Sequence, residues 1–396
     1  MMLKDNLRAA VKSQRENMGR KEELIEREIE AELDTESPHA VIISGVRRAG
    51  KSTLLKQLMD ETNTYLNFED TRLADFELRD FKKLQEIFEE EFKDHETVFL
   101  DEIQNVEEWE KYVRQQQEKG KKFFITGSNA SMLSKELGTR LTGRHLTYEI
   151  FPFSYREMLE LKDREASKES FKHYLEKGCF PEYLKYENQQ ILQELMQDIL
   201  IRDIAVRHNI RDTETLRKMA VYLMTNIGNE ITHNSLRDYF DLGSTNTVSS
   251  YISHFKESYL LFTIPQFHHS PKKQMVNPKK VYSIDTGLSK AHSLTSSPDR
   301  GRLLENAVFL HLRRQHNEIY YYQGENECDF LVREDGEIVK AFQSCYRLNE
   351  RNKQREIDGI KEVKEEFNPE ETKIVTLDQE EKIDGIEVVK AHSWMG

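Results

Sequence analysis

Short apolar runs recur through the first 150 positions, and each of them ends in polar residues. Between the first two runs, apolar residues recur with helical spacing from Leu54 to Met59. The runs themselves are rich in β-branched and aromatic residues, and they are VIIS (41–44), TYLNF (64–68), VFL (98–100) and FFI (123–125). Such runs are typical of strands buried on both faces of a parallel sheet. The alternation of strands and helices predicts a three-layer α/β domain.

The pattern changes along the rest of the chain and divides it further. Residues 5–34 are dense in charge, and we expect them to form a surface helix that packs across the sheet through Leu24, Ile25, Ile29 and Leu33. Helical periodicity continues from about 155 to 205, with a break at GCFPEYL (178–184), as in a connector or lid. The expected domains are 1–155 for the α/β domain with its N-terminal helix, 156–205 for the connector, 206–276 for an all-α module and 277–396 for a small α/β domain.

Composition narrows the class of protein. Apolar residues make up 37% and charged residues 33% of the 396 positions. No apolar run approaches the roughly 18 residues that a membrane-spanning helix needs, so we expect no membrane partner. The three cysteines lie far apart in sequence, and their odd number favours a reducing, cytoplasmic setting. With a net charge of -13, any nucleic-acid binding requires a local basic patch.

The first strand leads into GVRRAGKS (45–52), which matches G-x-x-x-x-G-K-[ST] at every fixed position. The glycines allow backbone N–H groups to point at phosphate oxygens, and the start of the next helix adds its dipole. The lysine of this motif reaches the β- and γ-phosphates, and the serine hydroxyl is a magnesium ligand. A chance glycine turn is the alternative, but the strand before and the helix after argue against it. With ATP and Mg as the expected cofactors, the contacting residues are Gly45, Val46, Arg47, Arg48, Ala49, Gly50, Lys51, Ser52 and Thr53.

A second motif, TVFLDEIQ (97–104), supplies a pair of acids at the end of an apolar strand. Asp101 is expected to hold the magnesium ion, and Glu102 is placed to act as the base that orients the attacking water. Two surface acids after a strand are the plain alternative. The pair lies about 50 residues after Lys51, which is the spacing of a parallel β-α-β-α-β unit. The two acids therefore indicate hydrolysis in addition to binding.

Two further segments carry candidate residues. KKFFITGSN (121–129) ends in Ser128 and Asn129, which would lie beside the γ-phosphate if this strand neighbours the loop strand; an ordinary turn is equally compatible. Arg140 and Arg144 lie in the next segment, and an arginine near a γ-phosphate stabilises the transition state, often from a neighbouring subunit. The alternative is that these arginines merely balance an acidic chain. The spacing does not decide which of the two, if either, acts in this way, and a role between subunits would imply a homo-oligomer.

At this point the sequence resembles a known group. The order GVRRAGKS, YLNFED, VFLDEIQ, ITGSN, LTGR and FPFSYREML is similar to that of archaeal and bacterial P-loop ATPases of the AAA+ superclass related to signal-transduction ATPases. The resemblance covers nearly the whole chain, since GCFPEYL, NPKKVYSIDTGL and GRLLENAVFLHL also look like segments of that group. It implies ATP binding and hydrolysis, and a C-terminal region similar in part to restriction-endonuclease-like folds. It supports Lys51, Ser52, Asp101 and Glu102, and it implies sensing roles for Ser128 and Arg144.

Residues 213–265 have the order of a winged helix-turn-helix module: a helix, a short helix capped by Thr232, the turn DLGS and a third helix. The third helix should turn Val248, Tyr251, Ile252 and Phe255 inward and Ser244, Asn246, Thr247, Ser249 and Ser250 outward. Residues 206–280 hold ten Lys and Arg against six Asp and Glu, and such a basic surface in an acidic chain fits DNA contact. Lys272, Lys273, Lys279 and Lys280 are the expected phosphate contacts. The alternative, to which we give equal weight, is that this module acts as a protein–protein or intramolecular clamp.

The C-terminal region offers a second candidate metal site. Glu305 on a helix, Asp329 on a strand and Gln343 two strands on match the layout of restriction-endonuclease-like sites, which gather two acids and a lysine around magnesium. The lysine is missing, because Cys345 stands two residues after Gln343. Lys340 lies three residues before Gln343 and would project from the other strand face. We therefore expect a degenerate site with little or no DNA cleavage.

These inferences lead to one expected function and one alternative. The favoured interpretation is a cytoplasmic Mg-ATPase that couples nucleotide state to DNA handling, through a winged-helix module and a degenerate nuclease-like domain. The alternative is a nucleotide-controlled regulatory switch that binds protein partners and cleaves no DNA. Stimulation of ATP turnover by DNA would separate the two.

Overall fold

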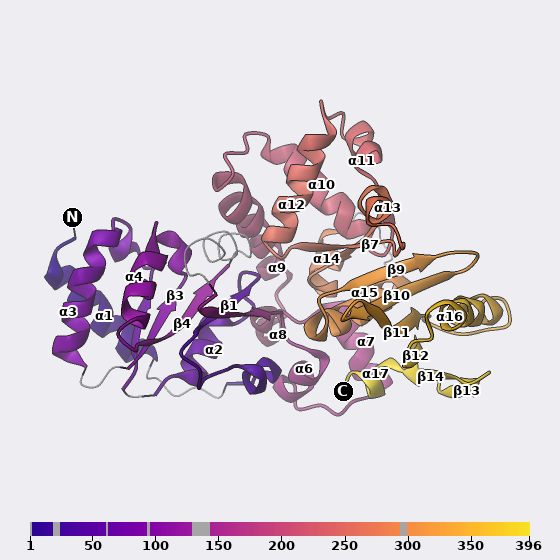
Figure 1. Ribbon diagram of the computed structural model, residues 1–396, viewed down its shortest axis with the longest axis horizontal. Helices are drawn as coiled ribbons and strands as arrows, with labels where there is room; N and C mark the ends of the chain where they lie inside the picture. Colours follow the sequence, from indigo (N-terminus) through magenta and orange to yellow (C-terminus); the bar gives the residue numbers. More distant parts are fainter. Residues whose placement is uncertain (1, 19–23, 61, 93–95, 129–142, 294–298) are drawn as a thin grey trace. The chain divides into compact units, whose positions relative to one another are not determined.

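The computed structural model of the chain describes residues 2–18, 24–60, 62–92, 96–128, 143–293 and 299–396. The chain forms two compact units, Met1–Phe151 and Pro152–Gly396 (Figure 1). Among the described residues, no helix is long and apolar enough to span a bilayer.

The first unit is built on a five-stranded parallel sheet, as the sequence predicts. Its strand order is β2-β3-β4-β1-β5, and the strands are β1 (Ala40–Gly45), β2 (Thr64–Asn67), β3 (Thr97–Asp101), β4 (Lys122–Gly127) and β5 (His145–Ile150). β4 lies between β1 and β3, and Ser44 at the end of β1 is in register with Gly127 at the end of β4. Because all strands run in the same direction, the segments that follow β1, β3 and β4 meet at one edge of the sheet.

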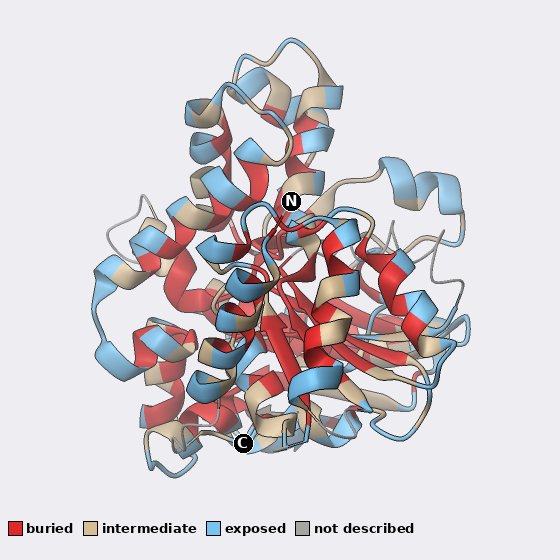
Figure 2. Ribbon diagram, turned by 90° about the vertical axis from the view of Figure 1, so that its left-hand side faces the viewer, coloured by how far each residue is buried: buried red, intermediate tan, exposed pale blue. Residues whose placement is uncertain are grey.

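Helices cover this sheet, and the buried residues concentrate on the strands and on the inner faces of the helices (Figure 2). The rings of Phe99 and Phe124 stack across β3 and β4 with centroids 4.8 Å apart. The helices in the described part of this unit are α1 (Lys4–Met18), α2 (Lys51–Leu58), α3 (Phe81–Glu91) and α4 (Trp109–Gln117), with the 3₁₀ turns η1 (Glu28–Glu32), η2 (Thr71–Leu73), η3 (Leu78–Asp80) and η4 (Ile103–Asn105).

The N-terminal segment differs from its prediction. Helix α1 ends at Met18, and it buries Leu7, Ala10 and Val11 against β2 and α3. Leu24, Ile25, Ile29 and Leu33, which we expected on the buried face of one helix, follow α1 in an extended stretch and in the short turn η1. The apolar face lies in the first half of residues 5–34, and it was hard to recognise because that segment is dense in charge. Two of its members, Ala10 and Val11, are also small.

The second unit begins with a series of short helices. They are α6 (Tyr155–Leu161), α7 (Lys168–Lys177), α8 (Pro181–Tyr186), α9 (Gln189–Asp198) and the π-helix η5 (Ile199–Val206). The predicted break is present, because Gly178 caps α7 with φ 71° and Pro181 occupies the first turn of α8. Pro is well suited to this position since its missing N–H would have no helical partner there.

The next segment contains α10 (Thr213–Thr225), α11 (His233–Tyr239), α12 (Thr245–Glu257) and α13 (Pro271–Val276) with the strands β6 (Glu230–Ile231), β7 (Leu261–Pro265) and β8 (Lys279–Ser283). Thr232 caps α11, and α12 buries the four residues expected on its inner face. Ser244, expected to face outward, instead caps α12 by accepting a hydrogen bond from the Thr247 amide. β8, which we placed in the C-terminal domain, pairs with both β6 and β7. An expected boundary at 276/277 would therefore cut through a sheet.

The C-terminal part is an α/β arrangement around a six-stranded mixed sheet of order β13-β14-β12-β11-β10-β9. Its strands are β9 (Ile319–Gln323), β10 (Glu327–Glu334), β11 (Glu337–Ser344), β12 (Glu371–Thr376), β13 (Glu381–Ile383) and β14 (Ile386–Lys390). Its helices are α14 (Thr286–His292), α15 (Arg300–Gln315), α16 (Lys353–Phe367) and α17 (Ala391–Trp394). The strands and the long helix predicted for this region are present.

Candidate functional site

The loop after β1 has the backbone that the glycine motif predicts. A Cβ atom on Gly45 would lie 2.1 Å from the carbonyl oxygen of Ile150, so only glycine fits there. Gly50 has φ 97° and directly precedes α2, where a left-handed conformation favours glycine. Arg48 also has a positive φ, of 61°. The loop residues Val46 and Ala49 are buried, whereas Ser52 and Thr53 at the start of α2 are exposed.

Arg27 supports this loop from inside the protein, and we did not predict it from the sequence. Its guanidinium donates hydrogen bonds to the carbonyl oxygens of Ala49 and Phe151, each over 2.8 Å. The residue is only 3% exposed. Nothing in the local sequence marks this arginine among the charged residues of its segment, because its partners lie 22 and 124 positions away.

Lys51 lies between the loop and the two acids after β3. Its ammonium donates hydrogen bonds to the carbonyl oxygens of Gly45 (3.1 Å) and Val46 (3.2 Å). It also lies 3.5 Å from Oε1 of Glu102. The side chain is 4% exposed. A buried cation held at the mouth of a glycine loop is the feature that phosphate binding requires.

Asp101 is fully buried and accepts several hydrogen bonds. The hydroxyl of Tyr65 donates to its Oδ2 over 2.8 Å, and the Asn67 amide donates over 3.2 Å. Thr126 donates to Oδ1, and the Ser52 hydroxyl also donates to this carboxylate. Burial, followed by the charge of Glu102, raises the pKa of Asp101 against the effect of these hydrogen bonds. The serine and the aspartate that we expected to share a metal ion are thus in contact.

Glu102 is oriented by its backbone and by Gln104. Its φ is 51°, and its amide donates to Oγ1 of Thr126 over 3.0 Å. Gln104 donates from Nε2 to the Glu102 carboxylate and, over 3.4 Å, to Oγ of Ser128. Burial alone would raise the pKa of Glu102. The ammonium of Lys51 and the hydrogen bond from Gln104 lower the pKa by more than burial raises it, so the net shift is downward.

Ser128 therefore lies beside the acid pair, at the edge of the sheet that the sequence predicts. The role of Thr126 was missed, although it stands in the same ITGSN string, because either face of a strand tip can point at a site. Arg140 and Asn129 lie outside the described residues.

Arg144 does not join this group. Its carbonyl oxygen accepts a hydrogen bond from the amide of Ala40, at the start of β1, whereas the loop begins at the other end of that strand. Five residues of strand separate the two points by roughly 17 Å, farther than an arginine side chain reaches. The proposed sensing role of Arg144, including a role toward a neighbouring copy, stays a prediction.

The C-terminal acids Glu305 and Asp329 do converge, but on a lysine that we had assigned to DNA contact. Nζ of Lys280, on β8, lies 3.0 Å from Oδ1 of Asp329, 3.6 Å from Oε1 of Glu305 and 2.7 Å from Oε1 of Glu327. Tyr282 donates a hydrogen bond to Glu305 over 2.7 Å. Lys280 is 4% exposed, so its expected role as a phosphate contact on the surface is wrong.

Gln343 completes this group. Its Oε1 accepts from the Asp329 amide over 3.1 Å, and its Nε2 donates to Glu356 over 2.6 Å. Burial raises the pKa of the Cys345 thiol to about 11, so the residue in the expected lysine position is neutral. The cation comes from Lys280 instead, and no sequence pattern could show this because 49 residues separate Lys280 from Asp329.

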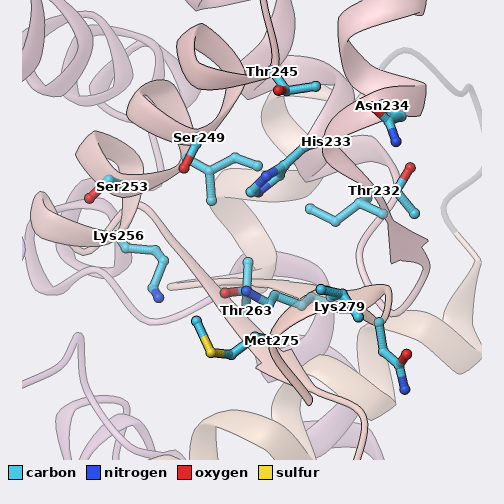
Figure 3. Close-up of a pocket in the computed structure, with 14 residues that line it drawn as sticks. Thr232, His233, Asn234, Thr245, Ser249, Ser253, Lys256, Thr263, Met275 and Lys279 are labelled. Carbon is cyan, nitrogen blue, oxygen red and sulfur yellow. The ribbon is translucent and has the colours of Figure 1, made fainter. Parts of the chain in front are cut away.

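A polar pocket of about 480 Å³ lies between the start of α11, one face of α12 and the segment from α13 to β8 (Figure 3). Its lining includes Thr232, His233, Ser249, Ser253, Lys256 and Lys279. Burial, followed by the neighbouring charge of Lys279, lowers the pKa of Lys256. The same two causes lower the pKa of His233. Basic groups thus crowd together around this pocket.

Comparisons with known proteins agree with the division at the end of the first sheet. Residues 37–159 match the family model of an AAA domain. Residues 168–299 match that of a domain of unknown function (DUF8612). The solved structure of the Aeropyrum pernix ORC1 protein in complex with DNA aligns with 72% of this chain and 91% of that chain, at 11% identity and a TM-score of 0.33. A TM-score this low supports no statement about the function of this chain.

Two relatives align along nearly the whole length. An uncharacterized protein of Haemophilus influenzae is 29% identical, over 89% of this chain and 93% of the relative. The uncharacterized protein MJ1544 of Methanocaldococcus jannaschii is 33% identical, over 95% of this chain and 92% of the relative. The chain therefore belongs to the family of MJ1544, and its first unit contains an AAA-type P-loop ATPase domain.

Proposed function

We propose that this protein is a magnesium-dependent ATPase whose hydrolytic centre lies between the loop 45–52 and the acids that end β3. The observation that carries the proposal is the position of Lys51, which bridges the loop carbonyls and Glu102. A lysine in this place can hold the β- and γ-phosphates while the glutamate faces the position of the attacking water.

The donor set fits magnesium, since Ser52 and Asp101 offer a hydroxyl and a carboxylate oxygen that are already in contact. These two residues would hold the ion, which would supply positive charge to stabilise the phosphate oxygens during transfer. Tyr65, Asn67 and Thr126 hold the Asp101 carboxylate in one orientation through their hydrogen bonds.

Glu102 has the properties of a general base. Its lowered pKa keeps it ionised at neutral pH, so it can accept a proton from water. Gln104 connects its carboxylate to Ser128. We propose that Ser128 detects the γ-phosphate and that this hydrogen-bonded connection transmits its presence to the base.

Replacement of Lys51 by alanine tests the nucleotide site. We expect Lys51→Ala to lose most ATP affinity, because it removes a buried cation from the phosphate loop. Titration of the purified chain with ATP and magnesium measures this, and Lys56→Ala, on the same helix α2, is the control. Equal ATP affinity in Lys51→Ala and the unchanged protein would contradict the assignment.

We further propose that the segment from α10 to β8 is a winged helix-turn-helix module that contacts DNA phosphates through the pocket of Figure 3. Lys256 and Lys279 supply positive charge, and the imidazole of His233 and the serines of α12 supply hydrogen-bond donors, as phosphate recognition requires. Lys272 and Lys273 on α13 add exposed charge beside it. A protein partner is the alternative occupant, in which case the chain is a nucleotide-controlled switch.

The slope of log affinity against log salt distinguishes these occupants. Duplex DNA should bind in a salt-sensitive manner, and Lys256→Gln with Lys279→Gln should flatten the slope by about one unit for each phosphate that is no longer neutralised. Lys218→Gln, on the exposed face of α10 where it pairs with Glu214, is the matched control. Absence of binding at low salt would favour the protein-partner function, and DNA that raises ATP turnover severalfold would favour DNA handling.

The cluster of Glu305, Asp329 and Gln343 is best described as a degenerate nuclease-like site. The ammonium of Lys280 lies between Glu305 and Asp329 and occupies the place of a cation there. Burial, followed by the charge of Asp329, raises the pKa of Glu305 to about 8. We therefore propose that the protein does not cleave DNA. Magnesium-dependent nicking that disappears in Asp329→Ala would contradict this.

A further inference from the structure

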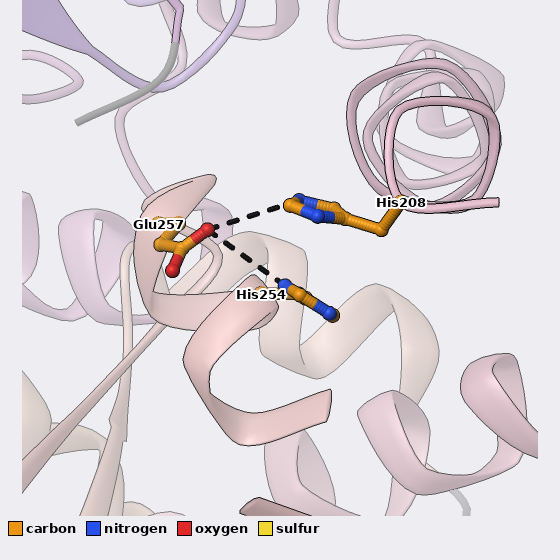
Figure 4. Close-up of side chains that lie close together, drawn as sticks. All are labelled: His208, His254 and Glu257. Carbon is orange, nitrogen blue, oxygen red and sulfur yellow. Dashed lines mark ion pairs between the residues drawn. The ribbon is translucent and has the colours of Figure 1, made fainter. Parts of the chain in front are cut away.

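Two histidines and a glutamate meet at the C-terminal end of α12. Oε2 of Glu257 lies 3.7 Å from Nε2 of His208 and 3.7 Å from Nδ1 of His254 (Figure 4). All three atoms lie within 4.8 Å of one another. The side chains are between 18% and 23% exposed, so solvent reaches the group but does not surround it.

Two different parts of the chain supply this group. His254 and Glu257 are three residues apart on α12 and therefore share one face of the helix. His208 comes from the turn after the π-helix η5, where its amide donates to the carbonyl oxygen of Ile204 over 2.9 Å. Local helix geometry and a backbone hydrogen bond thus fix the positions from which the three side chains extend.

The donor set is the one that zinc takes in proteins. Zinc binds imidazole nitrogen and carboxylate oxygen at about 2.0–2.1 Å in tetrahedral geometry, which places ligand atoms roughly 3.3 Å apart. The two nitrogen–oxygen distances of 3.7 Å need to close by only a few tenths of an ångström. The two nitrogens, which lie within 4.8 Å of each other, must also approach. The imidazole rings stack with centroids 3.6 Å apart and planes at 21°. They must turn about their side-chain bonds so that both lone pairs point at one position.

We propose that His208, His254 and Glu257 form a binding site for one divalent zinc ion, with water in the fourth position. Two neutral imidazoles and one carboxylate give the bound site a net charge of +1. The ion would join the last turn of α12 to the turn after η5. It would thereby fix the position of α12, another face of which lines the pocket of Figure 3. This inference does not depend on the ATPase proposal, because no residue of the first unit takes part.

The test is zinc binding by the full chain after treatment with a chelator and removal of that chelator. Zinc is titrated in competition with a chromophoric indicator, and cobalt is titrated separately because a tetrahedral cobalt site absorbs strongly in the visible range. The variants are His208→Ala, His254→Ala and Glu257→Gln. His269→Ala is the matched control, since His269 also pairs with a glutamate, Glu366, over 3.2 Å. Asp329→Asn tests the acidic cluster as the source of binding.

We expect one zinc ion per chain in the unchanged protein and in both controls. Each of the three ligand variants should weaken binding by more than about 100-fold, because even the outer hydrogen-bond partners of metal ligands contribute 10–100-fold. Glu257→Gln keeps the shape of the side chain, so it decides the question if an alanine variant loses its circular dichroism spectrum. Three results would overturn the proposal: no zinc binding by the unchanged protein, equal binding in Glu257→Gln, or loss of binding in Asp329→Asn alone.

Discussion

The ammonium of Lys51 lies 3.5 Å from the carboxylate of Glu102, and both side chains are largely buried. The glycine-loop motif and the acid pair after β3 are therefore in direct electrostatic contact. The positive charge lowers the pKa of Glu102 against the effect of burial. As a result, the glutamate is ionised at neutral pH and is available as a base.

Arg27 should matter for ATP affinity although it contacts only the backbone of the loop. Arg27→Met leaves the carbonyl oxygens of Ala49 and Phe151 without their buried donor, at a cost of about 1–3 kcal/mol for each. We expect a higher KM for ATP with a smaller change in kcat. Arg27→Lys should not restore the affinity, because one ammonium cannot replace a forked guanidinium. A KM equal to that of Arg114→Met, which changes an arginine that is 54% exposed, would show that Arg27 does not position the loop.

Lys280 should be one of the most important single residues for the stability of the second unit. Lys280→Met leaves Asp329 and Glu305 buried without their cation, and removal of one partner from a buried ion pair costs about 3–5 kcal/mol. Lys279→Met is the matched control. It changes the preceding residue, which lines the pocket, and surface changes of this kind stay within about 0.5 kcal/mol. Urea unfolding of both variants measures the difference, and equal free energies of unfolding would contradict the ion cluster.

His311 should make stability depend on pH. Burial, followed by the charge of Arg314, lowers the pKa of His311 to about 4. A histidine whose pKa is lower in the folded chain takes up a proton on unfolding. The free energy of unfolding should therefore fall as pH decreases from about 6.5 toward 4, by roughly 3 kcal/mol at most from this group.

His311→Phe keeps an aromatic ring beside Trp394, whose centroid lies 4.5 Å from that of His311, and removes the titration. The difference in unfolding free energy between this variant and the unchanged protein should vary with pH in that interval. A constant difference for His311→Phe across this interval would show that the pKa of His311 is not lowered in the folded chain.

The sequence predicts the glycine loop and the acid pair well because their structural elements are local. A β-branched run, a glycine loop and a helix follow one another within twenty residues, and the acid pair ends the next apolar strand but one. Parallel strand order then places these ends at one edge of the sheet. The helix N-cap at Thr232 and the inner face of α12 were predictable for the same reason.

The remaining contacts depend on residues that are distant in sequence. Arg27 reaches Phe151, and Lys280 reaches three carboxylates on other elements. His208 lies 46 positions before His254, and a histidine and a glutamate three apart on a helix are too common to indicate a site. Such charged residues look like ordinary surface positions until the fold brings their partners to them.

The ATP turnover of Glu102→Gln tests the central claim most directly. The amide keeps the shape of the side chain but cannot accept the proton of the attacking water, so we expect turnover to fall by about 10²–10⁴-fold while ATP still binds. Glu107→Gln, at an exposed position beyond η4, should turn over normally. A normal turnover rate in Glu102→Gln, measured beside an inactive Lys51→Ala variant, would contradict the account of Glu102 as the base.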